Sequence, residues 1–76
     1  MEESVYRVID VIGTSTESWE KAAANAVQVA AGSVQDLRVA EVLAMDVHLQ
    51  NGQVLAYRTK LRISFKYHPD IAEKND

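Results

Sequence analysis

Four basic side chains recur in one stretch of the chain and together could hold an anion. Arg58, Lys60, Arg62 and Lys66 all lie at even-numbered positions. Alternate residues of a β-strand point to the same face, so this spacing predicts a cationic row. Such a row suits a phosphate or carboxylate ligand, although a solvated or salt-bridged face is the more common use of the pattern.

Carboxylates offer a second kind of chemistry. Glu17 and Glu20 are separated by about one helical turn and together could attract a cation. Two carboxylates near the start of a helix also interact favourably with the helix dipole when no ligand is bound. The pair is therefore a candidate cation site with an equally simple structural explanation.

Catalytic motifs are missing from the sequence. It contains no cysteine, no glycine-rich phosphate loop, no HExxH motif and no EF-hand loop. His48 and His68 have no neighbours typical of a catalytic triad. We therefore expect no enzyme and no catalytic residues.

A β-hairpin must position the basic row. Leu37–Gln50 and Gln53–Tyr67 read as strands and flank Asn51-Gly52. Asn-Gly tolerates positive φ at both central positions of a type I′ turn. With Gln50 opposite Gln53, the continued register pairs Asp46 with Tyr57, Met45 with Arg58, Glu41 with Arg62 and Val39 with Ser64.

This register sorts the hairpin into two faces. One face is almost wholly apolar and should hold the core, with Ala40, Val42, Ala44, Tyr57, Leu61, Ile63 and Phe65. The other face is mixed, with Val39, Glu41, Leu43, Met45 and Val47 opposite Ala56, Arg58, Lys60, Arg62 and Ser64. A solvated face would not need so many apolar residues, so we expect part of it to be buried against another subunit.

Two elements precede the hairpin. Residues 5–12 are predicted to form a strand that is covered on both faces and ends at Gly13. A helix should follow and run to about Ser33, with Gly32 as an end signal. Its N-cap lies among Thr14, Ser15, Thr16 and Ser18, and its apolar stripe comprises Trp19, Ala22, Ala23, Ala26, Val27, Ala30 and Val34. We expect Trp19 to anchor the core rather than to stack on a ligand.

Length and composition bound the architecture. The chain has 76 residues, which suits a single domain with a marginal core and no cysteine to cross-link it. The fold class is α+β, a β-α-β-β chain with a three-stranded antiparallel sheet packed on one helix. We place the domain at residues 1–67 and a tail at 68–76. With a net charge of −3, no signal-peptide pattern and no long apolar run, we expect a cytoplasmic protein without nucleic-acid or membrane partners.

Several short motifs occur in a characteristic order. Gly13-Thr14-Ser15 precedes Ser18-Trp19-Glu20, and these are followed by Leu37-Arg38, Glu41-Val42, Asn51-Gly52, Tyr57, Arg62 and Phe65. In this order and spacing, over residues 4–67, the sequence resembles the dodecin family. The resemblance implies a hollow homododecamer, which would supply the burial that the mixed face requires.

The resemblance also assigns a ligand pocket. In flavin-binding dodecins a Trp in strand two stacks on the flavin and a Gln in strand three bonds its edge. This sequence has Val39 and Arg58 there, with Met45, Glu41 and Arg62 nearby. Val39 cannot stack on a planar ring and Arg58 offers donors only, so we do not expect flavin to bind in the usual way.

Val39-Ala40 and Tyr57-Arg58 resemble instead a divergent branch described as calcium-binding. Ca²⁺ needs several oxygen ligands, and symmetry could bring copies of one residue together. The candidate metal ligands are Glu17, Glu20, Asp36, Glu41 and Asp46.

The sequence thus predicts a non-catalytic oligomer that binds, buffers or stores a small ligand or ion, with calcium as the suggested ion. Two alternatives stay open. The first is storage of flavin or a phosphate-bearing cofactor such as coenzyme A, held by Arg58, Lys60 or Arg62. The second is a structural or partner-binding shell with no small ligand.

Overall fold

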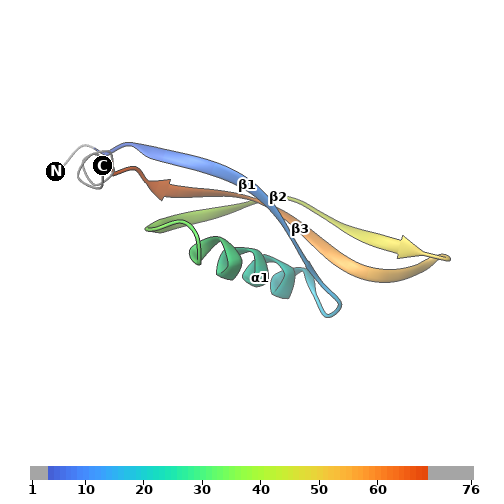
Figure 1. Cartoon of the computed structure of the whole chain (residues 1–76). Helices are drawn as coiled ribbons and strands as arrows, with labels where there is room; N and C mark the ends of the chain where they lie inside the picture. The colour runs from blue at the N-terminus through green and yellow to red at the C-terminus, as the bar shows by residue number, and fades with distance from the viewer. Residues whose placement is uncertain (1–3, 69–76) are drawn as a thin grey trace.

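One helix and three strands make up the structure, a computed structural model that describes residues 4–68. They follow in the order β1 (Tyr6–Ser15), α1 (Trp19–Ala31), β2 (Leu37–Gln50) and β3 (Gln53–Lys66). The strands form an antiparallel sheet in the order β1-β3-β2, and α1 lies along one face of it (Figure 1). The predicted α+β fold and its β-α-β-β order are confirmed.

The hairpin turn is also as predicted. Asn51 and Gly52 adopt φ values of 54° and 75°, as a type I′ turn requires. The β2–β3 hairpin extends well beyond the helix, and the molecule measures 52 × 27 × 14 Å (Figure 1). The helix therefore covers only part of the sheet.

The register between β2 and β3 differs from the prediction in its middle. Glu41 lies opposite Arg62 and Val39 opposite Ser64, as expected. Three irregularities leave Leu55, Leu43 and Arg38 without a direct partner across the ladder. Between the first two, the pairing moves by one residue, so the predicted Asp46–Tyr57 and Met45–Arg58 pairs are wrong. Asp46 is paired with Arg58, and Met45 with Thr59.

Helix α1 begins and ends at residues that the sequence indicated. The Ser18 side chain is the N-cap and accepts a hydrogen bond from the Lys21 amide, and Gly32 is the C-cap. Ala22, Ala26 and Ala30 are buried, which confirms that an alanine stripe faces the sheet. Small side chains let the helix axis lie close to the strands beneath it.

Gly13 has a different role from the one predicted. It does not end β1, which continues to Ser15. A Cβ atom at Gly13 would lie 2.0 Å from the Ala22 carbonyl oxygen and 2.9 Å from the Ala26 Cβ. The glycine is therefore needed for the close approach of α1 to the sheet.

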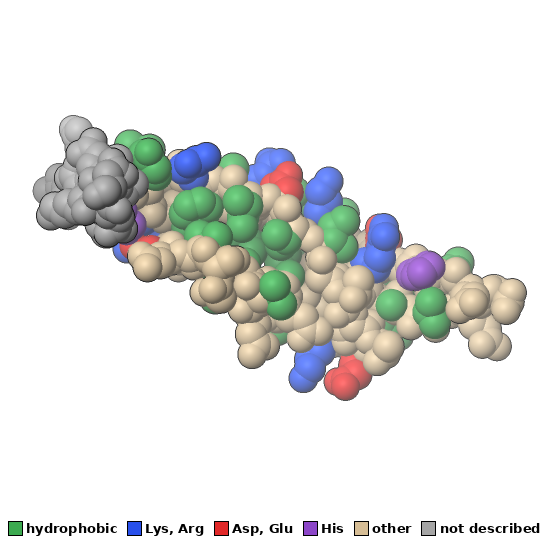
Figure 2. Space-filling view, viewed as in Figure 1, with side chains coloured by type: hydrophobic (Ala, Val, Ile, Leu, Met, Phe, Trp, Pro, Cys, Tyr) green, Lys and Arg blue, Asp and Glu red, His purple; other side chains and the backbone are tan. Residues whose placement is uncertain are grey.

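The core of one chain is small. Leu61 and Ile63, in the middle of β3, are each 1% exposed and contact the helix stripe. Many larger apolar side chains remain at the surface, and Figure 2 shows hydrophobic side chains gathered in patches along the visible face. Strand β1 was expected to be covered on both faces, but Val8 and Ile12 are 56% and 54% exposed in the single chain. Among the residues described, no helix is long and apolar enough to cross a membrane.

Candidate functional site

The face of the sheet that points away from α1 carries the basic row; we call it the outer face. Buried Thr59, Leu61 and Ile63 point toward the helix, so the residues between them in β3 point outward. Paired residues share a face. The outer face therefore includes Tyr6, Val8, Asp10, Ile12 and Thr14 of β1, Val39, Glu41, Ala44 and Asp46 of β2, and Arg58, Lys60, Arg62, Ser64 and Lys66 of β3.

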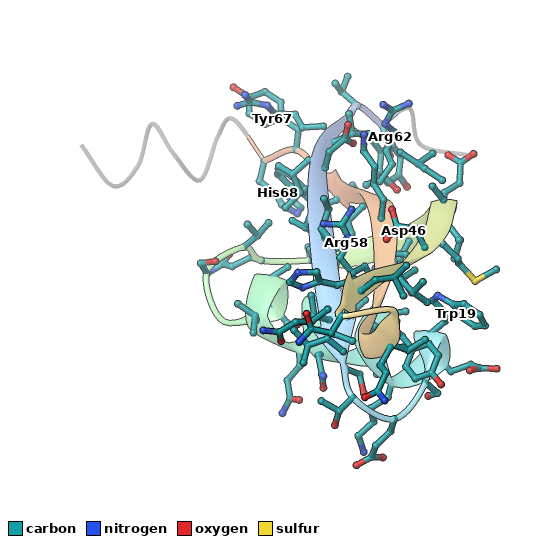
Figure 3. All side chains as sticks on the ribbon, turned by 90° about the vertical axis from the view of Figure 1, so that its right-hand side faces the viewer. Trp19, Asp46, Arg58, Arg62, Tyr67 and His68 are labelled. Carbon is teal, nitrogen blue, oxygen red and sulfur yellow. The ribbon has the colours of Figure 1, made fainter. Side chains whose placement is uncertain are left out.

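Two arginines of this row are engaged by carboxylates from opposite edges of the sheet. Arg58 Nε and Nη2 donate to the Asp46 carboxylate at 2.7 and 3.0 Å. Arg62 donates in the same way to Asp10 of β1, at 2.9 and 3.1 Å. Figure 3 shows Arg58 and Asp46 side by side. Hydrogen bonds from these arginines hold the pKa of Asp46 and of Asp10 below the usual aspartate value.

Lys60 lies between the two ion pairs. Its register partners, Ile12 and Ala44, carry no charge. The positive charge of Lys60 also helps to lower the pKa of Asp10. Because two of the cations on the outer face are already paired, the row is less available to an anion than the sequence indicated.

Val39 is 62% exposed at the edge of this face. A shallow hollow of about 190 Å³ lies beside it, lined by Val27, Leu37, Arg38, Val39, Ala40 and Ile63. None of these residues is aromatic, so the hollow offers no ring on which a planar ligand could stack. Of the predicted pocket residues, Val39, Glu41, Arg58 and Arg62 share the outer face.

Met45 does not share it. It is paired with buried Thr59 and lines a second hollow of about 250 Å³ on the helix side, together with Trp19, Glu20, Ala23, Val42 and Thr59. Sequence reasoning missed this hollow because it depends on the irregularity at Leu43. There one extra residue in β2 moves the side chains of residues 44–48 to the opposite face of the sheet from the one predicted. No glycine or other turn signal marks that position.

Trp19 closes one side of the second hollow. Its indole Nε1 donates to the Asp46 carbonyl oxygen at 2.9 Å, and its ring meets Tyr57 edge-on at 5.1 Å. The Thr59 hydroxyl donates to the Trp19 carbonyl oxygen at 2.9 Å. These contacts fix the start of α1 to both β2 and β3, in agreement with the anchoring role expected of Trp19.

The candidate metal ligands do not meet within one chain. Over residues 4–68, no three His, Asp or Glu side chains come together in a way that would hold a metal ion. Asp46 is paired with Arg58, and Asp36 accepts two hydrogen bonds from Arg38 and lies 2.8 Å from His68 Nε2. Glu20 lies in the first turn of α1, but Glu17 precedes the N-cap Ser18, so the two are not separated by a turn of helix as predicted. Over the described residues, no ion pair engages either carboxylate.

Asp36 is held by two basic side chains, Arg38 and His68. Hydrogen bonds from Arg38, and then from His68, lower the pKa of its carboxyl to about 2. Its backbone φ is +65°, a left-handed conformation that Asp tolerates better than most residues. The sequence did not indicate the Asp36–His68 contact, because His68 was assigned to the tail.

Comparisons with known proteins agree with this architecture. The dodecin family model matches residues 5–68. A curated relative, the calcium dodecin of Mycobacterium tuberculosis, is 54% identical over 66 residues, covering 87% of this chain and 93% of the relative.

Solved structures give the same result. The crystal structure of that calcium dodecin, described as a calcium-chelating immunodominant antigen with a novel calcium-binding site, has a TM-score of 0.78 at 55% identity and covers 87% of this chain and 94% of its own. A dodecin from Streptomyces coelicolor gives 0.84 at 31% identity, covering 90% and 97% of the two chains. The resemblance found in the sequence is thereby confirmed, and this chain belongs to the dodecin family.

Proposed function

We propose that the protein is a non-catalytic, self-assembling dodecin that binds an ion, and that the ion is calcium. The observation that carries the proposal is the 54% identity, over most of the chain, to a relative named for calcium. Binding, buffering or storage of that ion would then be its task. The alternatives are that the protein binds flavin, that it binds coenzyme A, or that it forms a structural shell with no small ligand.

Self-assembly is supported by the exposed apolar surface of the single chain. Val8, Ile12 and Val39 are more than half exposed on the outer face, and Val42 and Met45 on the helix side. Exposed apolar surface on this scale is typical of an interaction surface. We propose that copies of the chain cover both faces and form a hollow homododecamer.

A calcium site in this protein would draw on more than one subunit. Ca²⁺ takes six to eight oxygen ligands, and no described part of one chain gathers three acidic side chains. Glu17, Glu20 and Glu41 can bind without first breaking an ion pair, whereas Asp46 and Asp36 would have to give up Arg58 and Arg38. Of these three, Glu17 and Glu20 lie close together in the sequence, and Glu41 lies opposite Arg62. We propose that symmetry brings copies of the two glutamates together.

Flavin binding in the usual geometry has less support. At the two positions that the family resemblance assigns to flavin, Val39 has no ring and Arg58 already donates to both carboxylate oxygens of Asp46. A phosphate-bearing cofactor would compete with Asp46 and Asp10 for the same guanidinium groups. Lys60 is the basic side chain of the row that would contact it at least cost.

Native mass spectrometry of the untagged protein, before and after a calcium chelator, tests the proposal. We expect a twelve-subunit mass that carries calcium in a fixed ratio and loses it to the chelator. In Glu17→Gln/Glu20→Gln the calcium should be lost, whereas Asp10→Asn should keep it. A flavin or coenzyme A mass would overturn the calcium assignment, a bare dodecamer would favour the structural shell, and a monomer would contradict the assembly.

A further inference from the structure

The two edge strands of the sheet do not pair with one another. Strand β3 lies between β1 and β2 and bonds to both. The ladders end at Tyr6–Lys66 on one side and at Leu37–Phe65 on the other. Beyond these pairs, Tyr67 and His68, which follow β3, contact residues next to both edge strands.

Tyr67 fastens the chain to β1. Its amide donates to the Val5 carbonyl oxygen at 2.8 Å. Its ring lies under the Arg7 guanidinium, 5.6 Å from the ring centroid, within the range of a cation–π contact. Both contacts involve the β1 side of the sheet, and neither involves β2.

His68 fastens the next residue of the chain to β2. Its Nε2 lies 2.8 Å from the Asp36 carboxylate, which precedes β2 directly. An ionised carboxylate only accepts hydrogen bonds, so Nε2 is the donor. The Asp36 carbonyl oxygen accepts from the Lys66 amide at 3.2 Å, and Arg38 holds the carboxylate from the other side. Figure 3 shows Tyr67 and His68 at this end of the sheet.

We propose that Tyr67 and His68 form a strap that couples the two edge strands and sets their spacing at this end of the sheet. The strap is anchored at Val5 and Arg7 at the start of β1, and at Asp36 directly before β2. Backbone bonds from Lys66 to Asp36 and from Tyr67 to Val5 extend both ladders at this end, and the side chains of Tyr67 and His68 add one contact on each edge. Because Val8 and Val39 are the next outer-face residues along β1 and β2, the strap also fixes that end of the outer face. This inference does not depend on the identity of the ligand.

A strap and two independent contacts predict different effects on the opposite edge strand when one contact is removed. Releasing His68 from Asp36 should loosen β1, which His68 does not touch. Releasing Tyr67 from Arg7 should loosen the start of β2, which Tyr67 does not touch. Two independent contacts would each affect only the neighbouring edge.

Hydrogen exchange, followed by mass spectrometry on the full chain in its native assembly, measures this difference. In His68→Ala we expect amides of residues 6–8 to exchange about threefold faster or more, and in Tyr67→Ala the same of residues 37–39. The double variant should be no faster than either single one, because either change opens the strap. His68→Gln, which keeps a donor for Asp36, should stay close to the unchanged protein.

Asp46→Asn is the matched control, since it weakens an Arg–Asp pair of the same geometry far from this end. It should leave both segments unchanged. If His68→Ala affects only residues 37–39, if Tyr67→Ala affects only residues 6–8, or if the double variant shows simple addition, the strap is overturned in favour of two separate contacts.

Discussion

Arg58 donates two hydrogen bonds to the Asp46 carboxylate across the β2–β3 ladder, from Nε at 2.7 Å and from Nη2 at 3.0 Å. The same Asp46 accepts the Trp19 indole N–H with its backbone carbonyl oxygen. One residue therefore connects the outer face to the start of the helix on the other face. This arrangement exists only because Leu43 lies outside the pairing and turns Asp46 outward.

Restoring the two residues that flavin-binding dodecins use should restore some flavin affinity. Val39→Trp/Arg58→Gln supplies a planar stacking surface and an amide that both donates and accepts. We expect riboflavin to bind the double variant at least about tenfold more tightly than the unchanged protein, because a stacked Trp alone contributes about that much. Quenching of riboflavin fluorescence measures both affinities.

The control places the new ring on the other face of the same strand. Val42 is paired with Leu61 on the helix side, so Val42→Trp/Arg58→Gln carries the same chemical groups without facing the outer surface. It should bind no better than the unchanged protein. Equal gains in both variants would show that the outer face around Val39 is not the ligand surface.

Acid should weaken the fold through Asp36. Its carboxyl pKa is about 2 in the folded chain, lowered mainly by Arg38, against 3.8 for an ordinary aspartate. A lowered pKa stabilises the folded state fully above the unfolded value, and this stabilisation disappears as the pH falls through the folded value. The difference in melting temperature between the unchanged protein and Asp36→Asn should thus be constant above about pH 5 and shrink toward pH 2. A difference that stays constant over that range would show that the Arg38 and His68 contacts do not act on the Asp36 charge.

Trp19→Phe should destabilise the protein by about 1 kcal/mol, because the Asp46 carbonyl oxygen loses the indole donor while most of the ring packing is kept. Urea unfolding at one fixed protein concentration measures it. Tyr57→Phe is the matched control, since Tyr57 contributes its ring edge to Trp19. That change should stay within about 0.5 kcal/mol. A loss in Trp19→Phe no larger than that in Tyr57→Phe would show that the indole hydrogen bond to Asp46 contributes little to stability.

Local signals in the sequence were enough for the elements of the fold. Asn51-Gly52 specifies one turn geometry, Ser18 supplies a cap, and alanines at helical spacing specify which side of α1 faces the sheet. Each of these depends on residues within a few positions of one another. The packing of one helix on a three-stranded antiparallel sheet follows as the simplest arrangement of these elements, whereas the strand order β1-β3-β2 was not predicted.

The site was harder to predict because it depends on the register over the whole hairpin. One extra residue at Leu55 and another at Leu43 exchange the faces of residues 44–48. Both leucines are residues that are ordinary within a strand, so the sequence pattern does not indicate the shift in register. The partners of Asp46 and Met45 were therefore wrong, while Val39 and Glu41, beyond the second irregularity, were placed correctly. The Asp36–His68 contact joins residues 32 positions apart. A contact of this kind produces no periodic pattern in the sequence, so it could not be predicted.

Gly13→Ala should be among the most damaging single changes in the chain. The added methyl group would lie 2.0 Å from the Ala22 carbonyl oxygen, which belongs to the helix backbone and cannot swing away as a side chain would. Helix α1 must then lift from the sheet above Leu61 and Ile63, at a cost of about 3 kcal/mol or more. Gly32→Ala is the natural control, because its methyl group would lie 3.3 Å from the Val29 carbonyl oxygen at an ordinary helical φ of −73°. That change should stay within about 1 kcal/mol of the unchanged protein, because the loss of chain entropy in the unfolded state offsets the tight contact with Val29. Urea unfolding, compared at one protein concentration, separates the two variants; similar stabilities would mean that the helix does not rest on Gly13 as closely as the structure shows.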